Sequence, residues 1–285
     1  MIKADLVVEG GGMRGVYSSG VHDFFIEKDL FFENNYGVSA GACHLCSYLA
    51  KQYKRAFRVN VDYLNDKRYC SVHSLLKTGN LFGAEMLYDI IPNELDLFDY
   101  DTYNKNESNF YVVITDINTG KPEYVKIGDL KKDIIYVRAS SSLPLLAQNV
   151  KINDKEYLDG GISDSIPIKK SIADGNKKNV VILTRDSTYR KGKNSLMPII
   201  KLKYKKYPNF VKSMADRYIV YNEILDFIKE LEDNGDVFVI RPKKPVNIGR
   251  TEKNREKLEA LYNDGYNDAK DCYEELLKYL GKENL

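Results

Sequence analysis

A serine between two glycines is the feature of this chain that could most directly do chemistry. It lies in Gly37-Val38-Ser39-Ala40-Gly41, which has the GxSxG spacing of serine hydrolases. That motif needs a strand that ends abruptly, a serine in a strained turn and a helix that begins at once. The flanking sequence fits, because residues 36–38 read as a strand end and residues 40–53 as a helix. We therefore expect Ser39 to be presented as a nucleophile at the positive end of the helix dipole.

The three histidines argue against a Ser-His-Asp triad. In α/β-hydrolases the order along the chain is serine, acid, histidine. Here the histidines are His22, His44 and His73, and none follows residue 73. We expect the first two in helices beside the glycine motifs and His73 in a loop. Since a carboxylate in hydrogen-bond contact with the serine can also act as base, the sequence favours an acid in that role.

Asp159 is the best candidate for that acid. It ends the segment 150–158, which reads as a short hairpin, and Gly160 and Gly161 follow it and permit a tight turn. An acid in this position either caps its own turn or is delivered to the sheet edge as a base, and the spacing alone leaves both open. If it is the base, its carboxylate should lie within about 3.5 Å of the Ser39 hydroxyl.

A second glycine-rich loop, EGGGMRG at residues 9–15, follows a predicted strand at 4–8 and precedes a predicted helix at 16–28. Its consecutive glycines offer backbone amides that could bind an oxyanion. The loop also matches the GxGxxG of dinucleotide-binding folds, with Glu33 as an acid about 20 residues on. Those folds place the acid at the end of the second strand, whereas Glu33 precedes the strand that leads to Ser39. A non-catalytic nucleotide- or partner-binding α/β protein is therefore the weaker hypothesis.

Four motifs in this order resemble those of the patatin-like phospholipases: EGGGMRG (9–15), GVSAG (37–41), RASSSLPLL (138–146) and DGG (159–161). The resemblance covers roughly the first 185 residues. It implies a three-layer α/β/α fold with a mostly parallel central sheet and a C-terminal helical extension. It also implies a serine esterase or phospholipase that hydrolyses acyl esters of lipids.

The same resemblance implies roles for individual residues. Ser39 is the nucleophile that forms an acyl-enzyme, and Asp159 is its base. Oxyanion and substrate contacts come from the glycine-rich loop, namely Gly10, Gly11, Gly12, Arg14 and Gly15. The motif glycines that support the turns are Gly37, Gly41, Gly160 and Gly161. No metal or cofactor is expected, and an acyltransferase with the same dyad is an alternative that these motifs do not separate.

Periodicity indicates the organisation of the chain. Short apolar strands at 109–115 and 179–184 suit a sheet buried on both faces, and 122–127 reads as a hairpin or edge strand. Amphipathic helices are predicted at 214–231 and 258–280, with a strand at 237–240 between them. We expect a catalytic domain over 1–185, with 54–108 as a possible cap, and a mostly helical extension over 186–285 packed on it.

Charge and cysteine usage limit the partners. A net charge of +2 does not favour nucleic acid as a partner. Residues 190–206 nevertheless contain seven cations and no acid, interleaved with apolar residues. This segment is either a solvated loop or a basic lip that contacts anionic lipid head groups.

The same composition favours a reducing location. Cys43, Cys46, Cys70 and Cys272 suggest free thiols, and the Cys43–Cys46 spacing lacks a second pair for a zinc site. The apolar runs are strand-length, and Met1-Ile2-Lys3 leads directly into a strand without the features of a signal peptide. We expect a cytoplasmic protein, in peripheral contact with membranes if the basic lip acts as a lipid contact.

Overall fold

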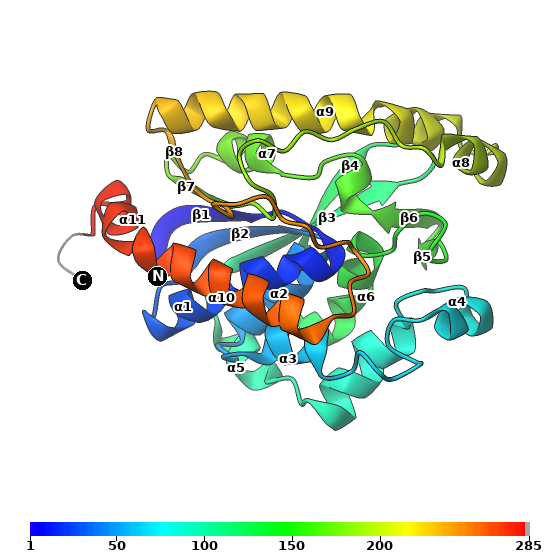
Figure 1. Cartoon of the computed structure of the whole chain (residues 1–285), viewed down its shortest axis with the longest axis horizontal. Coiled ribbons are helices and arrows are strands. Elements are labelled where there is room, and N and C mark those ends of the chain that lie inside the picture. Colours follow the sequence, from blue (N-terminus) through cyan, green and yellow to red (C-terminus); the bar gives the residue numbers. More distant parts are fainter. Residues whose placement is uncertain (283–285) are drawn as a thin grey trace.

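The computed structural model describes residues 1–282, in which a central sheet lies between two layers of helices (Figure 1). The sheet has the strand order β5-β6-β3-β2-β1-β7-β8, with β4 paired to β3. The strands are β1 (Ile2–Val8), β2 (Phe32–Val38), β3 (Asn109–Asp116), β4 (Pro122–Ile127), β5 (Val150–Ile152), β6 (Lys155–Asp159), β7 (Asn179–Ile182) and β8 (Val237–Ile240). Strands β3, β2, β1, β7 and β8 are parallel, β4 and β6 run antiparallel to β3, and β5 runs antiparallel to β6. The expected mostly parallel α/β fold is confirmed.

The helices cover both faces of this sheet. The α-helices are α1 (Val16–Glu27), α2 (Ala40–Leu49), α3 (Arg55–Val61), α4 (Val72–Thr78), α5 (Tyr100–Lys105), α6 (Leu130–Ser140), α7 (Ile168–Ala173), α8 (Met197–Lys203), α9 (Pro208–Asp233), α10 (Arg255–Asp271) and α11 (Tyr273–Leu280). Short 3-10 helices are η1 (Gly12–Gly15) and η3 (Gly160–Ile162), and η2 (Met86–Leu95) is a π-helix. Figure 1 shows α7 and α9 on one side of the sheet and α1, α2 and α10 on the other.

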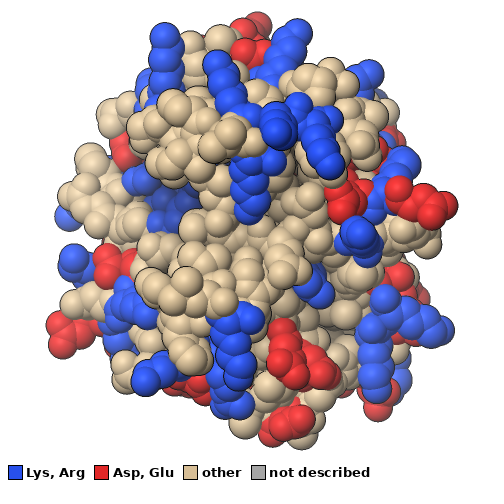
Figure 2. Space-filling model, turned by 90° about the vertical axis from the view of Figure 1, so that its right-hand side faces the viewer, with Lys and Arg blue, Asp and Glu red and all other residues tan. Residues whose placement is uncertain are grey.

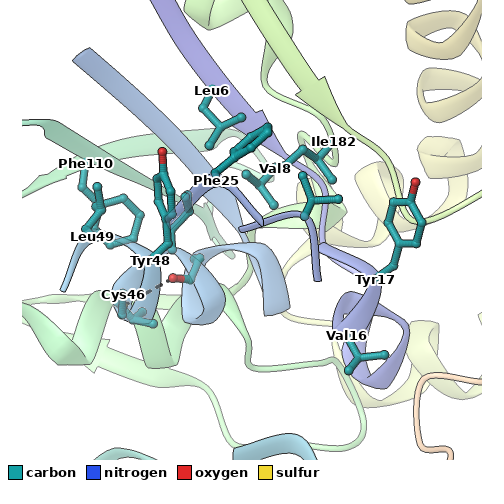
Figure 3. Packing of buried hydrophobic residues seen from close by; sticks show 14 of the residues in the cluster. Leu6, Val8, Val16, Tyr17, Phe25, Cys46, Tyr48, Leu49, Phe110 and Ile182 are labelled. Atoms are coloured by element: carbon teal, nitrogen blue, oxygen red, sulfur yellow. Dashed lines mark hydrogen bonds between the residues drawn. The ribbon is translucent and has the colours of Figure 1, made fainter. Parts of the chain in front are cut away.

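Strand β1 shows why the sheet is buried on both faces. Its residues point alternately to opposite sides, as the pleat of a strand requires. Leu6 and Val8 belong to the core beneath α1 and α2, whereas Val7 belongs to the core beneath α9. Figure 3 shows Leu6 and Val8 beside Phe25 of α1 and Ile182 of β7. The rigid parallel strands can therefore hold the loops at their carboxyl ends in fixed positions.

The C-terminal hundred residues contribute to the sheet as well as to the helical layers. Strand β8 pairs in parallel with β7, and α10 packs closely across α1. At that crossing a side chain at Gly20 would lie 2.1 Å from the Tyr262 carbonyl oxygen, and one at Gly265 would lie 2.1 Å from the Tyr17 carbonyl oxygen. Each helix therefore needs glycine where it meets the backbone of the other.

Four local predictions were wrong. Glu33, which we expected before the strand that leads to Ser39, lies within β2. The helix predicted over 40–53 ends at Leu49, because Lys51 and Lys54 take positive φ values and the chain turns there. The helix predicted over 258–280 is interrupted at Cys272 and forms α10 and α11. His73 lies in α4, since the Ser71 hydroxyl accepts a hydrogen bond from the amide of Ser74 and caps a helix at this point.

Candidate active site

Strand pairing brings Ser39 and Asp159 together across 120 residues of sequence. On β3, Val113 pairs with Val38, the last residue of β2, and Ile114 pairs with Asp159, the last residue of β6. Both strands lie on the edge of β3 opposite β4, because β4 occupies the other edge at these same positions. Since β6 runs antiparallel to β2, the carboxyl ends of the two strands meet. Ser39, which follows β2, therefore faces Asp159, which ends β6.

Ser39 occupies a strained turn between β2 and α2. Its φ of 55° and ψ of −125° are unusual for a residue with a side chain. The Ser39 amide donates a hydrogen bond of 2.8 Å to the hydroxyl of Ser140, the last residue of α6, and this bond holds the turn. A side chain at Gly37 or Gly41 would lie 2.6 Å from backbone atoms, so both motif glycines are required by close packing.

The carboxylate of Asp159 is held by contacts on both of its oxygens. Its Oδ2 accepts a 2.7 Å hydrogen bond from the Ser39 hydroxyl, and its Oδ1 accepts a 2.8 Å bond from the amide of Gly161. The Asp159 amide also donates to the Ser142 carbonyl oxygen at 2.8 Å. Ser39 and Asp159 are 8% and 2% exposed, so their hydrogen bond is shielded from bulk water.

This burial changes the acidity of Asp159. Removal from water raises the pKa of Asp159 above its usual range, and the positive charge of Arg217 opposes that rise. The hydrogen bonds from Ser39 and Gly161 act in the same direction as Arg217. A carboxylate with a raised pKa is a stronger base than an ordinary aspartate, which suits it to accept a proton from a hydroxyl.

The glycine-rich loop lies directly against Ser39. A side chain at Gly10 would come within 2.7 Å of the Ser39 Cβ atom, and one at Gly15 within 2.8 Å of the Ala40 Cβ atom. Within residues 1–282, the amides of Gly11 and Gly12 donate no hydrogen bond to the protein. Arg14 is buried beside them, at 6% exposure. The loop thus presents free amides and a cation next to the serine.

Glu9 holds this loop in place through both of its carboxylate oxygens. Its Oε2 accepts hydrogen bonds from the amide and hydroxyl of Thr184, at 2.7 and 2.9 Å, and its Oε1 accepts one of 2.6 Å from the Tyr221 hydroxyl. On the other side, the Met13 amide donates a 3.0 Å bond to the Arg250 carbonyl oxygen. The loop is therefore fixed by partners from the segment that follows β7 and from the C-terminal region.

Two cavities of opposite character meet at Ser39. One, with about 660 Å³ of empty space, is lined mainly by apolar and aromatic side chains, which include Met13, Val59, Phe82, Leu87 and Leu143. The other, with about 380 Å³, is lined by Ser39 and Asp159 together with Arg14, Lys191, Arg217 and Arg250. Sequence reasoning missed Arg217 and Arg250 entirely and placed Lys191 in the basic lip.

None of the three histidines takes the position of the base. The Ser39 hydroxyl is bonded to Asp159, while the Nε2 atom of His44 lies 2.9 Å from the Asn60 amide nitrogen. His22 is buried and stacks on Tyr48 with ring centroids 4.9 Å apart. Burial lowers the pKa of His44 to about 4 and holds that of His22 well below its usual value. His73 is exposed on α4.

The remaining candidate groups have no common metal-binding geometry. Over the described range 1–282, no cluster of three or more His, Cys, Asp or Glu side chains could hold a metal ion. The four cysteines are free thiols, and the Cys43 sulfur lies 3.2 Å from the Ser141 hydroxyl. In the same range, no helix has both the length and the apolar character needed to cross a bilayer.

Comparison with known proteins identifies the family of this chain. The sequence model of the Patatin-like phospholipase family matches residues 6–171, and that of a domain of unknown function, DUF6363, matches residues 207–281. The uncharacterized protein YjjU of Escherichia coli (strain K12) is 28% identical over 258 residues, which cover 85% of this chain and 69% of that protein. The probable lipid hydrolase 463L of Invertebrate iridescent virus 6 is 25% identical over 215 residues, 65% of this chain and 71% of that protein.

A solved structure is similar over most of the chain. The crystal structure of VipD from Legionella pneumophila aligns with 99% of this chain and 67% of its own, at 11% sequence identity and a TM-score of 0.47. The family assignment depends instead on the sequence match, which spans more than half of the chain and includes the glycine-rich loop, the serine motif and the DGG motif. The chain belongs to the patatin-like phospholipase family and is a hydrolase that acts on carboxylic ester bonds.

Proposed function

We propose that this protein hydrolyses acyl esters of lipids through a Ser39–Asp159 dyad and an acyl-enzyme intermediate. The observation that carries the proposal is the 2.7 Å hydrogen bond from the buried Ser39 hydroxyl to Asp159 Oδ2. Nucleophile and base within this distance form the minimal arrangement for covalent catalysis. The Gly161 amide holds the second carboxylate oxygen, so the base is oriented before substrate binds.

The reaction proceeds in two balanced steps. Asp159 accepts the Ser39 proton as the Ser39 oxygen attacks the ester carbonyl, and the amides of Gly11 and Gly12 stabilise the oxyanion. The bond to the leaving alcohol then breaks, and Asp159 returns the proton to that alcohol. In the second step Asp159 accepts a proton from water, whose oxygen attacks the acyl group, and the proton returns to Ser39 as the fatty acid leaves.

The apolar cavity provides a place for the acyl chain. Ser39 forms part of its wall, and Met13, Leu87 and Leu143 contribute apolar surface nearby. A bound hydrocarbon chain would exchange contact with water for contact with these side chains, which favours binding roughly in proportion to the apolar area covered. The segment 54–108, which we propose as a cap, supplies Val59, Phe82 and Leu87 to this wall.

The pH dependence of ester hydrolysis tests the role of Asp159. The active form has Asp159 ionised, so activity should fall as the pH decreases through the raised pKa of this group. Arg217→Gln removes the charge that lowers the pKa of Asp159, and we expect the acid limb to move to higher pH. The measurement is the pH profile of kcat/KM for a soluble p-nitrophenyl ester. An unmoved limb, or one displaced to lower pH, would contradict the assignment.

We also propose that the basic lip, residues 190–206, contacts anionic lipid surfaces through α8. Ile199 and Leu202 are 54% and 74% exposed on this helix, and Lys201 and Lys203 are exposed between and beside them. Figure 2 shows Lys and Arg side chains along the upper part of the face on which α8 lies. Not all seven cations are available, since Arg190 pairs with Asp226 at 2.7 Å and Lys191 turns toward Tyr221.

Neutralising the exposed lysines tests this contact. Lys201, Lys203, Lys205 and Lys206 changed together to glutamine should weaken binding to phosphatidylglycerol vesicles by at least about tenfold, because each cation near an anionic bilayer contributes about 1 kcal/mol. Turnover of a soluble short-chain ester should not change. The matched control changes the exposed Lys28, Lys105, Lys177 and Lys229 instead. Equal vesicle binding by the two quadruple variants would contradict a lipid contact and would show that the segment is only a solvated surface.

A further inference from the structure

The second cavity at Ser39 is built from cations that come from distant parts of the chain. Arg14 lies in the glycine-rich loop, whereas Lys191, Arg217 and Arg250 all lie in the C-terminal hundred residues. A side chain at Gly161 would lie 3.1 Å from the Arg217 Nη2 atom, which places this guanidinium beside the turn that carries Asp159. The Lys191 Nζ atom lies 4.1 Å from the ring centroid of Tyr221.

The protein supplies no matching partners for these charges. Counting only residues 1–282, none of the four side chains forms an ion pair or donates a hydrogen bond. The Nε atoms of Arg14 and Arg217 are fully buried without an acceptor in that range. The two carboxylates at the cavity, Glu9 and Asp159, are already bonded to Tyr221 and Ser39. Buried donors without acceptors are costly, which points to an acceptor brought by a ligand.

Mutual repulsion accompanies this lack of partners. Burial, followed by the charges of Arg217 and Arg250, lowers the pKa of Lys191 to about 7. Burial, followed by the charge of Arg250, likewise lowers the pKa of Arg217 to about 10. Cations that repel one another in a shielded cavity are stabilised by an anion placed between them.

We propose that this cavity is an anion-binding subsite that takes the phosphomonoester group of an acylated substrate, with Arg14, Lys191, Arg217 and Arg250 as its donors. The inference rests on the proposed function of Ser39 for its position in the reaction, because the same cavity includes the nucleophile. The C-terminal region thereby becomes part of the substrate site. Such a substrate places its ester at Ser39, its acyl chain in the apolar cavity and its phosphate among the cations.

Charge favours a phosphomonoester over head groups without net charge. A phosphomonoester carries about 1.5 to 2 negative charges near neutral pH and offers three strong acceptor oxygens, which match planar guanidinium donors. A phosphocholine group has no net charge, and its quaternary ammonium would face Arg217 and Arg250. Phosphatidate and lysophosphatidate are acyl esters that carry such a phosphomonoester.

Ligand binding tests the subsite without requiring catalysis. Glycerol 3-phosphate should bind the Ser39→Ala variant saturably in calorimetry. A second substitution, Arg217→Gln or Arg250→Gln, should weaken that binding by roughly 10- to 100-fold, because it removes a charge-assisted contact. Lys212→Gln is the matched control, since Lys212 is exposed on the same helix as Arg217 and carries the same charge. Circular dichroism of each variant establishes that it is folded.

The outcomes separate the subsite from the proposed function. Absence of saturable binding to folded Ser39→Ala, or equal weakening by Lys212→Gln, would overturn the subsite. Glycerol 3-phosphate binding with no ester hydrolysis by the wild-type protein would refute the proposed function but leave the subsite in place.

Substrate preference tests the lipid assignment. In micelles of a neutral detergent, phosphatidate should be hydrolysed at least about tenfold faster than phosphatidylcholine of the same acyl chains, a difference that Arg250→Gln should reduce. Equal rates for the two lipids, with inorganic phosphate bound as tightly as glycerol 3-phosphate, would overturn the lipid assignment in favour of a free-phosphate site.

Discussion

Replacing Ser39 by alanine is expected to reduce ester hydrolysis by a factor of about 10³ or more, since the variant has no atom that can form the acyl-enzyme. The fold should persist. The Ser39 amide, rather than its side chain, makes the bond to Ser140, and the Asp159 carboxylate keeps its bond from Gly161. The measurement is kcat/KM for p-nitrophenyl butyrate, with the thermal midpoint of each protein as the control. Wild-type turnover by a folded Ser39→Ala variant would show that another residue is the nucleophile.

Asp159→Asn is expected to cost a comparable factor, roughly 10³ to 10⁴ in kcat, by analogy with the loss of the acid in a serine triad. Asparagine can keep the bond from the Gly161 amide through its Oδ1 atom. Its amide nitrogen then replaces the oxygen that accepts the Ser39 hydrogen, so it cannot take the proton. The measurement is single-turnover hydrolysis of the same ester, which isolates the chemical step.

Histidine substitutions provide the comparison for Asp159→Asn. His73→Ala changes an exposed residue of α4 and should leave kcat nearly unchanged. His22→Ala and His44→Ala remove buried side chains, so their main expected effect is a lower free energy of unfolding. The rates are therefore normalised to the folded fraction of each protein. A loss in any one of them that matches Asp159→Asn would argue for a histidine base.

Local signals in the sequence predict much of the fold. Strands β1, β3 and β7 and helix α1 are confirmed to within a few residues, because each has a clear apolar pattern. The break at Cys272 was missed because the apolar spacing continues on both sides of it, and no glycine or proline marks the break. The division of the chain after residue 185 and the cap at 54–108 stay predictions.

The site could be predicted only in part, because its parts are joined by long-range pairing. The GxSxG motif marks Ser39 locally, but spacing left Asp159 open between a turn cap and a base. Only the resemblance to the patatin-like family paired the two. The contact depends on the registers of β2 and β6 on β3, which no local pattern encodes.

The cationic cavity was not predictable by the same reasoning. Arg217 lies on an amphipathic helix whose apolar face defines the pattern, so a charged residue there reads as a solvated one. Arg250 lies in a segment between β8 and α10 without any periodic pattern. Both are brought to Ser39 by the packing of the C-terminal region on the catalytic sheet. A site assembled from such segments becomes visible only in three dimensions.

The central claim, that Ser39 is the nucleophile, is tested most directly by a fluorophosphonate. This reagent forms a stable covalent bond with an activated serine, and peptide mapping by mass spectrometry locates it. We expect one label per molecule, on the peptide that contains Ser39, with strongly reduced labelling in Asp159→Asn and none in Ser39→Ala. Label on a different residue, or undiminished labelling of Ser39→Ala, would contradict the account.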